Sequence, residues 1–278
     1  GIRNTAPSGV IPDSVIYSFY IGAAILIACV IYTSLKVKEM PPKEYAEYHG
    51  ITAQEAKEKT NIFKLLVKAP SAFWSVGLVQ FFCWAAFMFM WTYTNGSIAL
   101  NVFDTPTVES MGKIVLDTKS IQYQEAANWV GVLFAVQAIG SVLWAIVIPF
   151  FKNKKTIYSL SLVLGGVGFI SVMFIHSPYL LFVSFLLIGC AWAAMLALPF
   201  TILTNALSGG HMGTYLGLFN GTICIPQIVA AALGGTILSL LTPAGSVAPE
   251  VDMLAIAGIL LFAGAVAVGI IRNQKQPA

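Results

Sequence analysis

Residues 198–227, LPFTILTNALSGGHMGTYLGLFNGTICIPQ, decide the fold, because a short glycine-rich turn separates two long apolar segments. Before a helix in a soluble protein, SGGHMG would be a candidate phosphate-binding loop, since free N–H groups at a helix start attract anions. That interpretation requires a strand in front of the loop. The preceding apolar run, 180–207, is too long for a strand, and a second long run, 214–241, follows. The turn is therefore predicted to be a tight connection between two membrane-spanning helices.

The composition of the whole chain supports this interpretation. Of its 278 residues, 58% are hydrophobic and 10% are charged, whereas about a quarter are charged in an ordinary soluble domain. A helix needs about 20 mainly apolar residues to cross about 30 Å of hydrocarbon. Strand-like alternation is absent, which disfavours a membrane barrel. We therefore predict an all-α membrane protein with seven transmembrane helices, at residues 14–35, 71–93, 126–151, 156–175, 180–207, 214–241 and 253–271.

Lysine and arginine are distributed unequally between the two sets of loops that seven spans create. Of the 15 Lys and Arg residues, 12 fall in the loop 36–70, the turn FKNKK at 151–155 and the tail 272–278. The other three are Arg3, Lys113 and Lys119. Since cytoplasmic loops carry an excess of these residues, we predict a multi-pass protein of the cell (inner) membrane. Its N-terminus is expected outside and its C-terminus in the cytoplasm.

The sequence contains no arrangement of residues typical of an enzyme or a metal site. The four cysteines all lie within predicted spans without metal-ligand spacing, and His49, His176 and His211 fall in loops. A membrane enzyme needs paired carboxylates, or a histidine with a nucleophile or carboxylate, within its spans. We therefore expect no catalytic residue, no metal, no cofactor and no nucleic-acid partner.

The loop lengths divide the chain into one span and a group of six. Residues 1–35 are expected to form an outer segment and one helix, and 36–70 a charged cytoplasmic linker with an amphipathic helix at NIFKLLVKAP. Residues 71–271 then form six helices, followed by a cytoplasmic tail, 272–278. Transporters built as two six-span halves joined by a linker contain this arrangement as their sixth span, linker and second half. On this plan the chain is expected to be a fragment lacking the first five spans.

Three stretches carry a more specific likeness: LVQFFCWAAFMFMWTYTNGSIAL at 78–100, LLIGCAWAAMLALPFTILTNAL at 186–207 and MGTYLGLFNGTICIPQIVAAALGG at 212–235. Together they resemble the seventh, tenth and eleventh spans of sugar-cation symporters of the major facilitator superfamily. The likeness is closest to the glycoside-pentoside-hexuronide group and its sucrose-proton carriers. Two features depart from that family. The turn FFKNKK keeps only positive charge, and Thr94 and Asn95 stand where relatives often carry an acidic residue.

The resemblance implies secondary active transport of a glucoside or disaccharide, sucrose- or maltose-like, coupled to a cation, H+, by alternating access. The expected partners are then the sugar, the coupling cation, the lipid bilayer and the missing N-terminal half. All 12 acidic residues lie in loops, tails or span ends. Coupling residues are therefore expected outside these spans, and the resemblance implies that they lie mainly in the missing first half, where the family carries its acidic coupling residues.

A sugar-binding site requires amides for the hydroxyl groups and aromatic faces for the apolar C–H faces. Gln80, Trp84, Trp91 and Asn95 fall along one helical stripe and are predicted to line a cavity. A packing face of aromatic residues, with Gln80 bonded to a neighbouring helix, fits the same pattern equally well. The two interpretations differ in whether the polar groups face a ligand or another helix.

Further spans are expected to complete the cavity. An amide that faces lipid leaves several hydrogen-bonding groups unsatisfied, so each must meet protein, water or substrate. A bond between helices is the alternative for each amide. The predicted lining residues are Gln137, beside Ser141 and Trp144; Trp192, beside Met195; and Asn220 and Gln227, beside Cys224.

Prolines and glycines are expected to shape these helices. Pro199 and Pro226 each remove one backbone hydrogen bond and are predicted hinges, with static kinks as the alternative. Small residues allow membrane helices to approach closely. Close contacts are therefore predicted at Gly165, Gly166 and Gly168 and at the G-x-x-x-G step of Gly217 and Gly221.

A seven-helix membrane receptor or sensor is the alternative function, because the number of spans and the outer N-terminus fit it equally. A retinal protein of this kind needs a lysine inside its last span, and residues 253–271 contain none. The short loops also carry no recognisable receptor signature. The sequence therefore favours the transporter.

Overall fold

The computed structural model describes residues 13–38, 41, 44, 47, 48, 62–207 and 212–271. In these residues seven helices are long and apolar enough to cross a membrane, which confirms the predicted all-α membrane fold. The chain separates into two compact units, Gly1–Glu58 and Lys59–Ala278, and their boundary falls inside the predicted linker. His49, His211, the predicted tail 272–278 and much of the linker lie outside the described residues.

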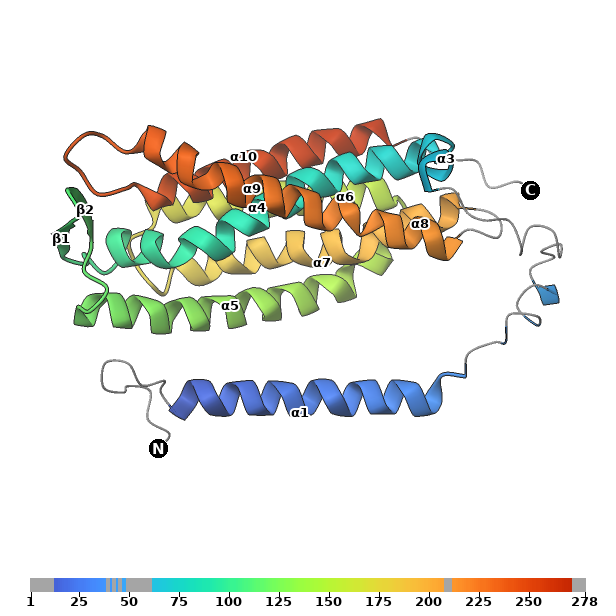
Figure 1. Cartoon of the computed structure of the whole chain (residues 1–278), viewed down its shortest axis with the longest axis horizontal. Helices are drawn as coiled ribbons and strands as arrows, with labels where there is room; N and C mark the ends of the chain where they lie inside the picture. The colour runs from blue at the N-terminus through green and yellow to red at the C-terminus, as the bar shows by residue number, and fades with distance from the viewer. Residues whose placement is uncertain are drawn as a thin grey trace. The chain divides into compact units, whose positions relative to one another are not determined.

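The first unit contains α1, Asp13–Lys36 (Figure 1). Its ends suit the helix dipole, because an acidic residue lies in the first turn and a basic residue in the last. The hydroxyls of Ser18 and Thr33 donate to backbone carbonyls four residues earlier, which satisfies these polar groups locally. None of the side chains of α1 is buried among the described residues. An apolar helix exposed on all sides is typical of a span surrounded by lipid or by other membrane helices.

The second unit is a bundle of six membrane-crossing segments that run side by side (Figure 1). Short 3-10 turns, Ile148–Phe150, Val172–Phe174 and Val268–Ile270, extend α5, α6 and α10 at their C-terminal ends. The elements are α3 (Ile62–Val67), α4 (Ser71–Asn101), β1 (Thr107–Ser110), β2 (Lys113–Leu116), α5 (Ile121–Val147), α6 (Lys154–Ser171), α7 (Leu181–Ala206), α8 (Met212–Phe219), α9 (Gly221–Leu241) and α10 (Glu250–Ala267).

The helices of the second unit are covered to very different extents. Helix α4 packs against α10 and α9 and also contacts α5 and α7. Helix α7 packs on both α5 and α6, and α6 in turn packs on α10. Many residues of α4 and α7 are therefore buried, whereas α5 and α9 bury only a few each. The unit leaves one side of α5 and most of α9 uncovered.

Glycines permit the close contacts of α6, as predicted. A Cβ atom built at Gly168 would lie 2.6 Å from the backbone carbonyl oxygen of Ser184 on α7. At Gly166 it would lie 2.6 Å from the ring of Phe262 on α10, and at Gly165 it would overlap a side chain of α7. Because the neighbouring backbone cannot move away easily, side chains at these positions would push the helices apart.

The predicted close contact at Gly217 and Gly221 is wrong for this unit. A Cβ atom at Gly217 would meet nothing within 4 Å, and one at Gly221 would meet only Ile225 of its own helix, at 3.8 Å. Instead, the predicted span 214–241 is interrupted here, because α8 ends and α9 begins at either side of Asn220. Two glycines that flank an asparagine favour such an interruption, since both residue types weaken a helix interior.

Helix α4 continues eight residues beyond the predicted end at residue 93. The added turns contain polar residues, but these are satisfied within the helix. The hydroxyl of Thr94 donates to the carbonyl of Met90 (2.6 Å), and that of Ser97 donates to the carbonyl of Tyr93 (2.7 Å). Thr and Ser that bond back in this way add little polarity to a helix surface. The continuously apolar stretch of the sequence therefore ends at residue 93, although the helix continues to Asn101.

A β-hairpin follows α4 between the predicted spans 71–93 and 126–151, in the segment that contains Lys113 and Lys119. Strands β1 and β2 pair antiparallel, with Ser110 opposite Lys113. Between them, Met111 and Gly112 have φ angles of 53° and 72°. Two central residues with positive φ define the tight hairpin turn whose twist suits paired strands.

The two ends of the second unit differ in charge. At the end where α4 and α6 begin, the described residues hold five lysines and no acidic residue: Lys64, Lys68, Lys152, Lys154 and Lys155. At the opposite end, where α4 ends and α10 begins, lie the unit's six described acidic residues together with Lys113 and Lys119: Asp104, Glu109, Asp117, Glu125, Glu250 and Asp252.

Candidate functional site

An aromatic cluster joins α4 and α7 in the middle of the bundle; it consists of Trp84, Phe87 and Trp91 of α4 and Trp192 of α7. Trp192 lies edge-to-face with Trp84 and with Trp91, at 5.8 Å between ring centroids in both pairs. Phe87 lies 4.9 Å from Trp192. The structure thus brings together the three tryptophans that were predicted, on two separate spans, to line one cavity.

The members of the aromatic cluster differ in how much surface they keep. Trp84 is 7% exposed, whereas Trp91 is 43% exposed and Trp192 is half-buried. Edge-to-face packing holds the rings in fixed orientations. Trp91 and Trp192 therefore retain aromatic surface that a further group could contact, while Trp84 is mostly enclosed by its neighbours.

Three polar side-chain atoms of α4 are buried without a hydrogen-bond partner. They are Nε2 of Gln80, Nε1 of Trp84 and Oδ1 of Asn95; a fourth such atom, Oγ1 of Thr105, lies in the loop after α4. A buried polar group without a partner costs about 1–3 kcal/mol. Three such atoms therefore lie on one predicted stripe of α4, and the described part of the protein provides none of them with a hydrogen-bond partner.

Gln80 uses one of its side-chain atoms in a bond to a neighbouring helix and leaves the other without a partner. Its Oε1 accepts a hydrogen bond from the hydroxyl of Tyr158 on α6 (3.2 Å), which is the predicted bond between helices. Its Nε2 remains unpaired. Since the side chain is fully buried, Tyr158 fixes the amide and leaves its donor available. Sequence reasoning missed Tyr158, because a tyrosine in an apolar run carries no mark of its partner.

On α5, the predicted lining residues are engaged mainly with neighbouring helices. Gln137 is buried where α5 meets α7, and a Cβ atom built at Gly189 would overlap its backbone carbonyl. The indole N–H of Trp144 donates to Oγ of Ser161 on α6 (2.8 Å). The polar atom of Trp144 is thus used in a bond between helices, and its place in the cavity lining stays a prediction. Ser141 is half-buried, and its backbone nitrogen lies against Gly189 of α7, as the carbonyl of Gln137 does.

The predicted residues of the segment α8–α9 have no recorded contact with the aromatic cluster among the described residues. Asn220 is exposed at the junction of α8 and α9, and Gln227 is half-buried on α9. The carbonyl of Asn220 accepts from the backbone N–H of Cys224 (3.1 Å), which starts the new helix. Among the residues that the structure describes, no hydrogen bond or ring contact joins Asn220 or Gln227 to the tryptophans.

The two prolines lie inside helices that continue through them. Pro199 is buried in α7 and Pro226 is buried in α9. The interruption of the last-but-one span occurs at Asn220, six residues before Pro226, and not at the proline itself. The assignment of both prolines as hinges stays a prediction.

An acidic residue that sequence reasoning placed at a span end also contacts α4. Glu250 begins α10, and its carboxylate lies directly over the backbone at Gly96, where a Cβ atom would overlap it. Gly96 follows Asn95 in the sequence but points to another side of α4, so this carboxylate contacts α4 beside the predicted stripe and not on it. In the described ranges, no group of three or more His, Cys, Asp or Glu side chains could hold a metal ion.

Comparison with known proteins did not identify a family for this chain. A scan against models of known protein families gave no match, and a search of curated proteins found none either. The resemblance to sugar-cation symporters therefore stays a prediction that rests on the quoted sequence stretches.

Proposed function

We propose that the chain forms part of a secondary transporter that moves a glucoside or disaccharide together with a cation, H+, by alternating access. The observation that carries the proposal is the row of unpaired polar atoms on α4, at Gln80, Trp84 and Asn95, beside exposed aromatic surface of Trp91. A sugar supplies hydroxyl groups for such atoms and C–H faces for such rings. A purely apolar ligand would leave the polar atoms unsatisfied.

The position of a bound sugar follows from the length of the stripe. Gln80 and Asn95 are 15 residues apart, which is about 22 Å along a helix. This length exceeds a disaccharide, so one ligand cannot contact both ends. We assign the sugar to the region of Trp84, Trp91 and Trp192, and Asn95 to the approach from the end that carries the hairpin.

Two features of the helices suit alternating access. The segment α8–α9 is interrupted at Asn220, and interrupted helices at membrane depth are typical of transporter binding sites. Helices α5 and α9 also leave broad faces uncovered. In the proposed transporter, the first half covers these faces, and Asn220 and Gln227 meet the sugar across the interface between the halves.

The proposed orientation rests on charge. The lysine-only end of the second unit corresponds to the cytoplasmic side and the hairpin end to the outside. His176 then lies outside, where its Nδ1 is 2.8 Å from the carbonyl oxygen of Asn101. In a variant without the native cysteines, His176→Cys should react with a membrane-impermeant maleimide only from outside. Reaction only from the cytoplasmic side would reverse the topology.

A binding experiment tests the proposed function directly. The purified chain in lipid nanodiscs is titrated with sucrose, maltose and a simple polyol while its tryptophan fluorescence is recorded. We expect saturable changes with the disaccharides only. Trp84→Phe keeps the ring and removes the unpaired N–H, so affinity should fall about 2- to 12-fold, the equivalent of about 0.5–1.5 kcal/mol for a hydrogen bond to a neutral group.

Trp74→Phe is the matched control, because Trp74 lies on the same helix and is 56% exposed near its start. This variant should bind as the unchanged chain does. The absence of saturable binding by any glucoside, or an equal loss in both variants, would contradict the proposal. A visible absorption band in the purified protein would favour the receptor or sensor instead.

A second experiment tests whether transport needs the first half. Reconstituted alone in liposomes, the chain should show no sugar uptake under a proton or sodium gradient, because alternating access moves one half against the other. Gradient-driven uptake by a proven monomer of this chain would contradict the assignment of the chain to one half.

A further inference from the structure

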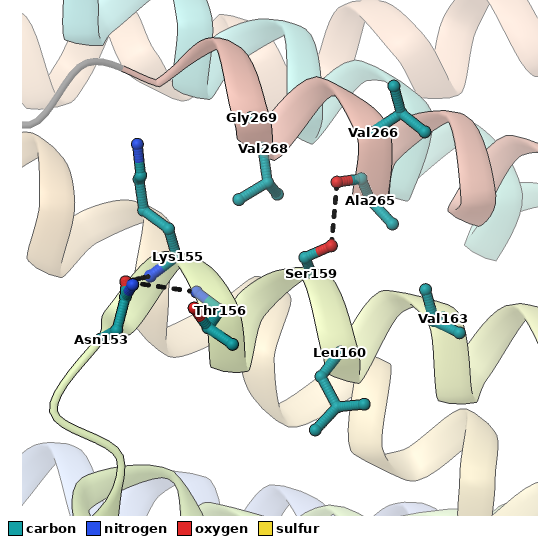
Figure 2. Close-up of a pocket in the computed structure, with 10 residues that line it drawn as sticks. All are labelled: Asn153, Lys155, Thr156, Ser159, Leu160, Val163, Ala265, Val266, Val268 and Gly269. Atoms are coloured by element: carbon teal, nitrogen blue, oxygen red, sulfur yellow. Dashed lines mark hydrogen bonds between the residues drawn. The ribbon is translucent and has the colours of Figure 1, made fainter.

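A groove lies between α6 and α10 on the outside of the bundle (Figure 2). Its volume is about 540 Å³, and it is open along one side. Its walls come from the first three turns of α6 and from the last turns of α10. The groove shares no residue with the aromatic cluster, whose members belong to α4 and α7.

One end of the groove is polar and carries positive charge. Asn153 caps α6, because its Oδ1 accepts from the backbone N–H groups of Lys155 (3.1 Å) and Thr156 (3.4 Å). The Nζ atom of Lys155 donates to the carbonyl of Ile271 just beyond α10. Figure 2 shows Asn153 and Lys155 together at this end, with the lysine side chain extending toward α10. The cap and the lysine together hold the two helices at the mouth of the groove.

The opposite end of the groove is apolar. Figure 2 shows Leu160 and Val163 of α6 and Val266 of α10 at this end. All three are exposed, Val266 at 77%. Between the two ends, Oγ of Ser159 donates to the carbonyl of Ala265 (3.0 Å), so this hydroxyl is already satisfied. The groove therefore changes along its length from charged to purely apolar.

The charge at the polar end is not balanced by the protein that the structure describes. Lys152 and Lys154 flank Asn153, and neither has an ion pair or hydrogen bond through its side chain within the described residues. The six described acidic residues of the unit lie at the other end of the bundle. An anion is thus the complement that this end lacks.

We propose that this groove binds an anionic phospholipid. The phosphate lies at the polar end of the groove beside Asn153 and Lys155, to which Lys152 and Lys154 are adjacent in the sequence, and one acyl chain follows the apolar end. A small phosphate compound would leave the apolar walls uncovered, and a zwitterionic lipid would bring no net charge to the lysines. Basic pockets between membrane helices at the cytoplasmic side are suited to anionic headgroups, and each lysine near the surface contributes to the attraction.

The test measures binding of single lipid molecules to the purified full chain by native mass spectrometry. Phosphatidylglycerol and phosphatidylcholine with identical acyl chains are compared, and glycerol phosphate is added as a competitor. Phosphatidylglycerol should bind more tightly than phosphatidylcholine, and glycerol phosphate should compete only weakly. In Lys152→Gln/Lys154→Gln, the phosphatidylglycerol affinity should fall roughly 5-fold for each lysine removed. Lys155 is kept because it also joins the helices.

Two controls distinguish the groove from general surface charge. Lys64→Gln/Lys68→Gln removes the same charge from the same end of the bundle, but neither lysine is adjacent in the sequence to a residue that lines the groove, so its lipid affinity should not change. Gly269→Leu adds a side chain inside the groove, where a Cβ atom meets nothing within 4 Å, and should weaken phosphatidylglycerol binding with all lysines present. Gly131→Leu, at an equally open position on α5, should leave it unchanged.

Three results would overturn the proposal. Equal affinity for the two lipids would show that the lysines do not select charge. Equal losses in the two double-lysine variants would assign the effect to general surface charge. Competition by glycerol phosphate at the lipid's own affinity would assign the site to a small phosphate compound.

Discussion

Helices α4 and α9 look alike in sequence but differ in their surroundings. Both are long apolar segments interrupted by amides, Gln80 and Asn95 in α4 and Gln227 in α9, with Asn220 immediately before α9. In α4, the amides are wholly or partly enclosed by the bundle, and each has a buried atom without a partner. In α9, most of the helix surface is uncovered. The same residue pattern therefore serves an enclosed site in one helix and an outward face in the other.

The largest expected difference between α4 and α9 is in the reactivity of their cysteines. Cys83 of α4 is 0% exposed, and Cys224 of α9 is exposed. In detergent, with Cys29 and Cys190 replaced by serine, a maleimide should modify Cys224 readily and Cys83 only when the protein unfolds. Mass spectrometry of the intact chain gives both rates.

Equal rates for the two cysteines would contradict the comparison. In bilayers, a membrane-impermeant maleimide also tests whether the outward face of α9 meets water or lipid. Modification of Cys224 would place the outward face of α9 against water, as a transport cavity requires, and modification by lipid-soluble reagents alone would place it against lipid.

Substitutions at two adjacent glycines of α9 test which side of this helix α4 covers. A Cβ atom at Gly234 would lie 2.6 Å from Oη of Tyr93 and 3.3 Å from the ring of Phe89, whereas one at Gly235 meets nothing within 4 Å. Gly234→Ala should therefore lower the free energy of unfolding by about 1–3 kcal/mol through overpacking. Gly235→Ala should leave it unchanged or raise it by up to about 1 kcal/mol, since alanine favours a helix. Thermal unfolding in detergent measures both, and similar melting temperatures would show that α9 does not pack on α4 as described.

The next smaller expected effect is the change in sugar affinity when predicted site residues are replaced. Alanine variants of Trp84, Trp192, Asn220 and Gln227, made in the proposed complete transporter, should each weaken sugar binding about 2- to 12-fold. The Asn220 and Gln227 variants should keep the melting temperature, whereas the two tryptophan variants should also lower it, because both rings are packed in the aromatic cluster. If Gln227 instead bonds another helix, its variant should unfold at a lower temperature while the surviving protein binds sugar normally. Four normal affinities would mean that other residues line the cavity.

The smallest effect concerns the bond that fixes Gln80. Tyr158→Phe removes the donor to Gln80 Oε1, and the coupling energy between these two residues should be about 0.6 kcal/mol, the average from double-mutant cycles on hydrogen bonds between membrane helices. Gln80→Leu and the double variant complete a thermodynamic cycle. A coupling energy of zero would show that the bond contributes nothing to the attachment of α4 to α6.

The sequence predicted the seven spans because hydropathy and length determine whether a helix can cross a membrane. The predicted span 180–207 differs from α7 by one residue at each end. Hydropathy could not predict the last two turns of α4, because hydroxyl groups that bond to their own helix count as polar. Hydropathy also could not predict the interruption at Asn220, because glycine and asparagine weaken a helix without making the segment less apolar overall.

The site was only partly predictable, for a different reason. Helical periodicity placed Trp84 and Trp91 on one face, and the structure brings Trp192 to them. Periodicity gives the direction of a side chain around one helix but not the residue that it meets on another. The bonds of Trp144 to Ser161 and of Tyr158 to Gln80, and the contact of Glu250 with Gly96, all join separate helices. These contacts depend on how the helices are arranged, and the sequence of one helix alone does not show this arrangement.

The hairpin between α4 and α5 makes the protein easier to image. Almost all of the second unit's folded mass consists of helices that a detergent micelle or nanodisc would surround, and such particles offer few features for alignment. Strands β1 and β2 add a backbone-paired element whose turn at Met111 and Gly112 projects fully exposed. An antibody fragment raised against this rigid epitope would mark one face of the membrane and provide a landmark for electron microscopy of a chain of 29.8 kDa.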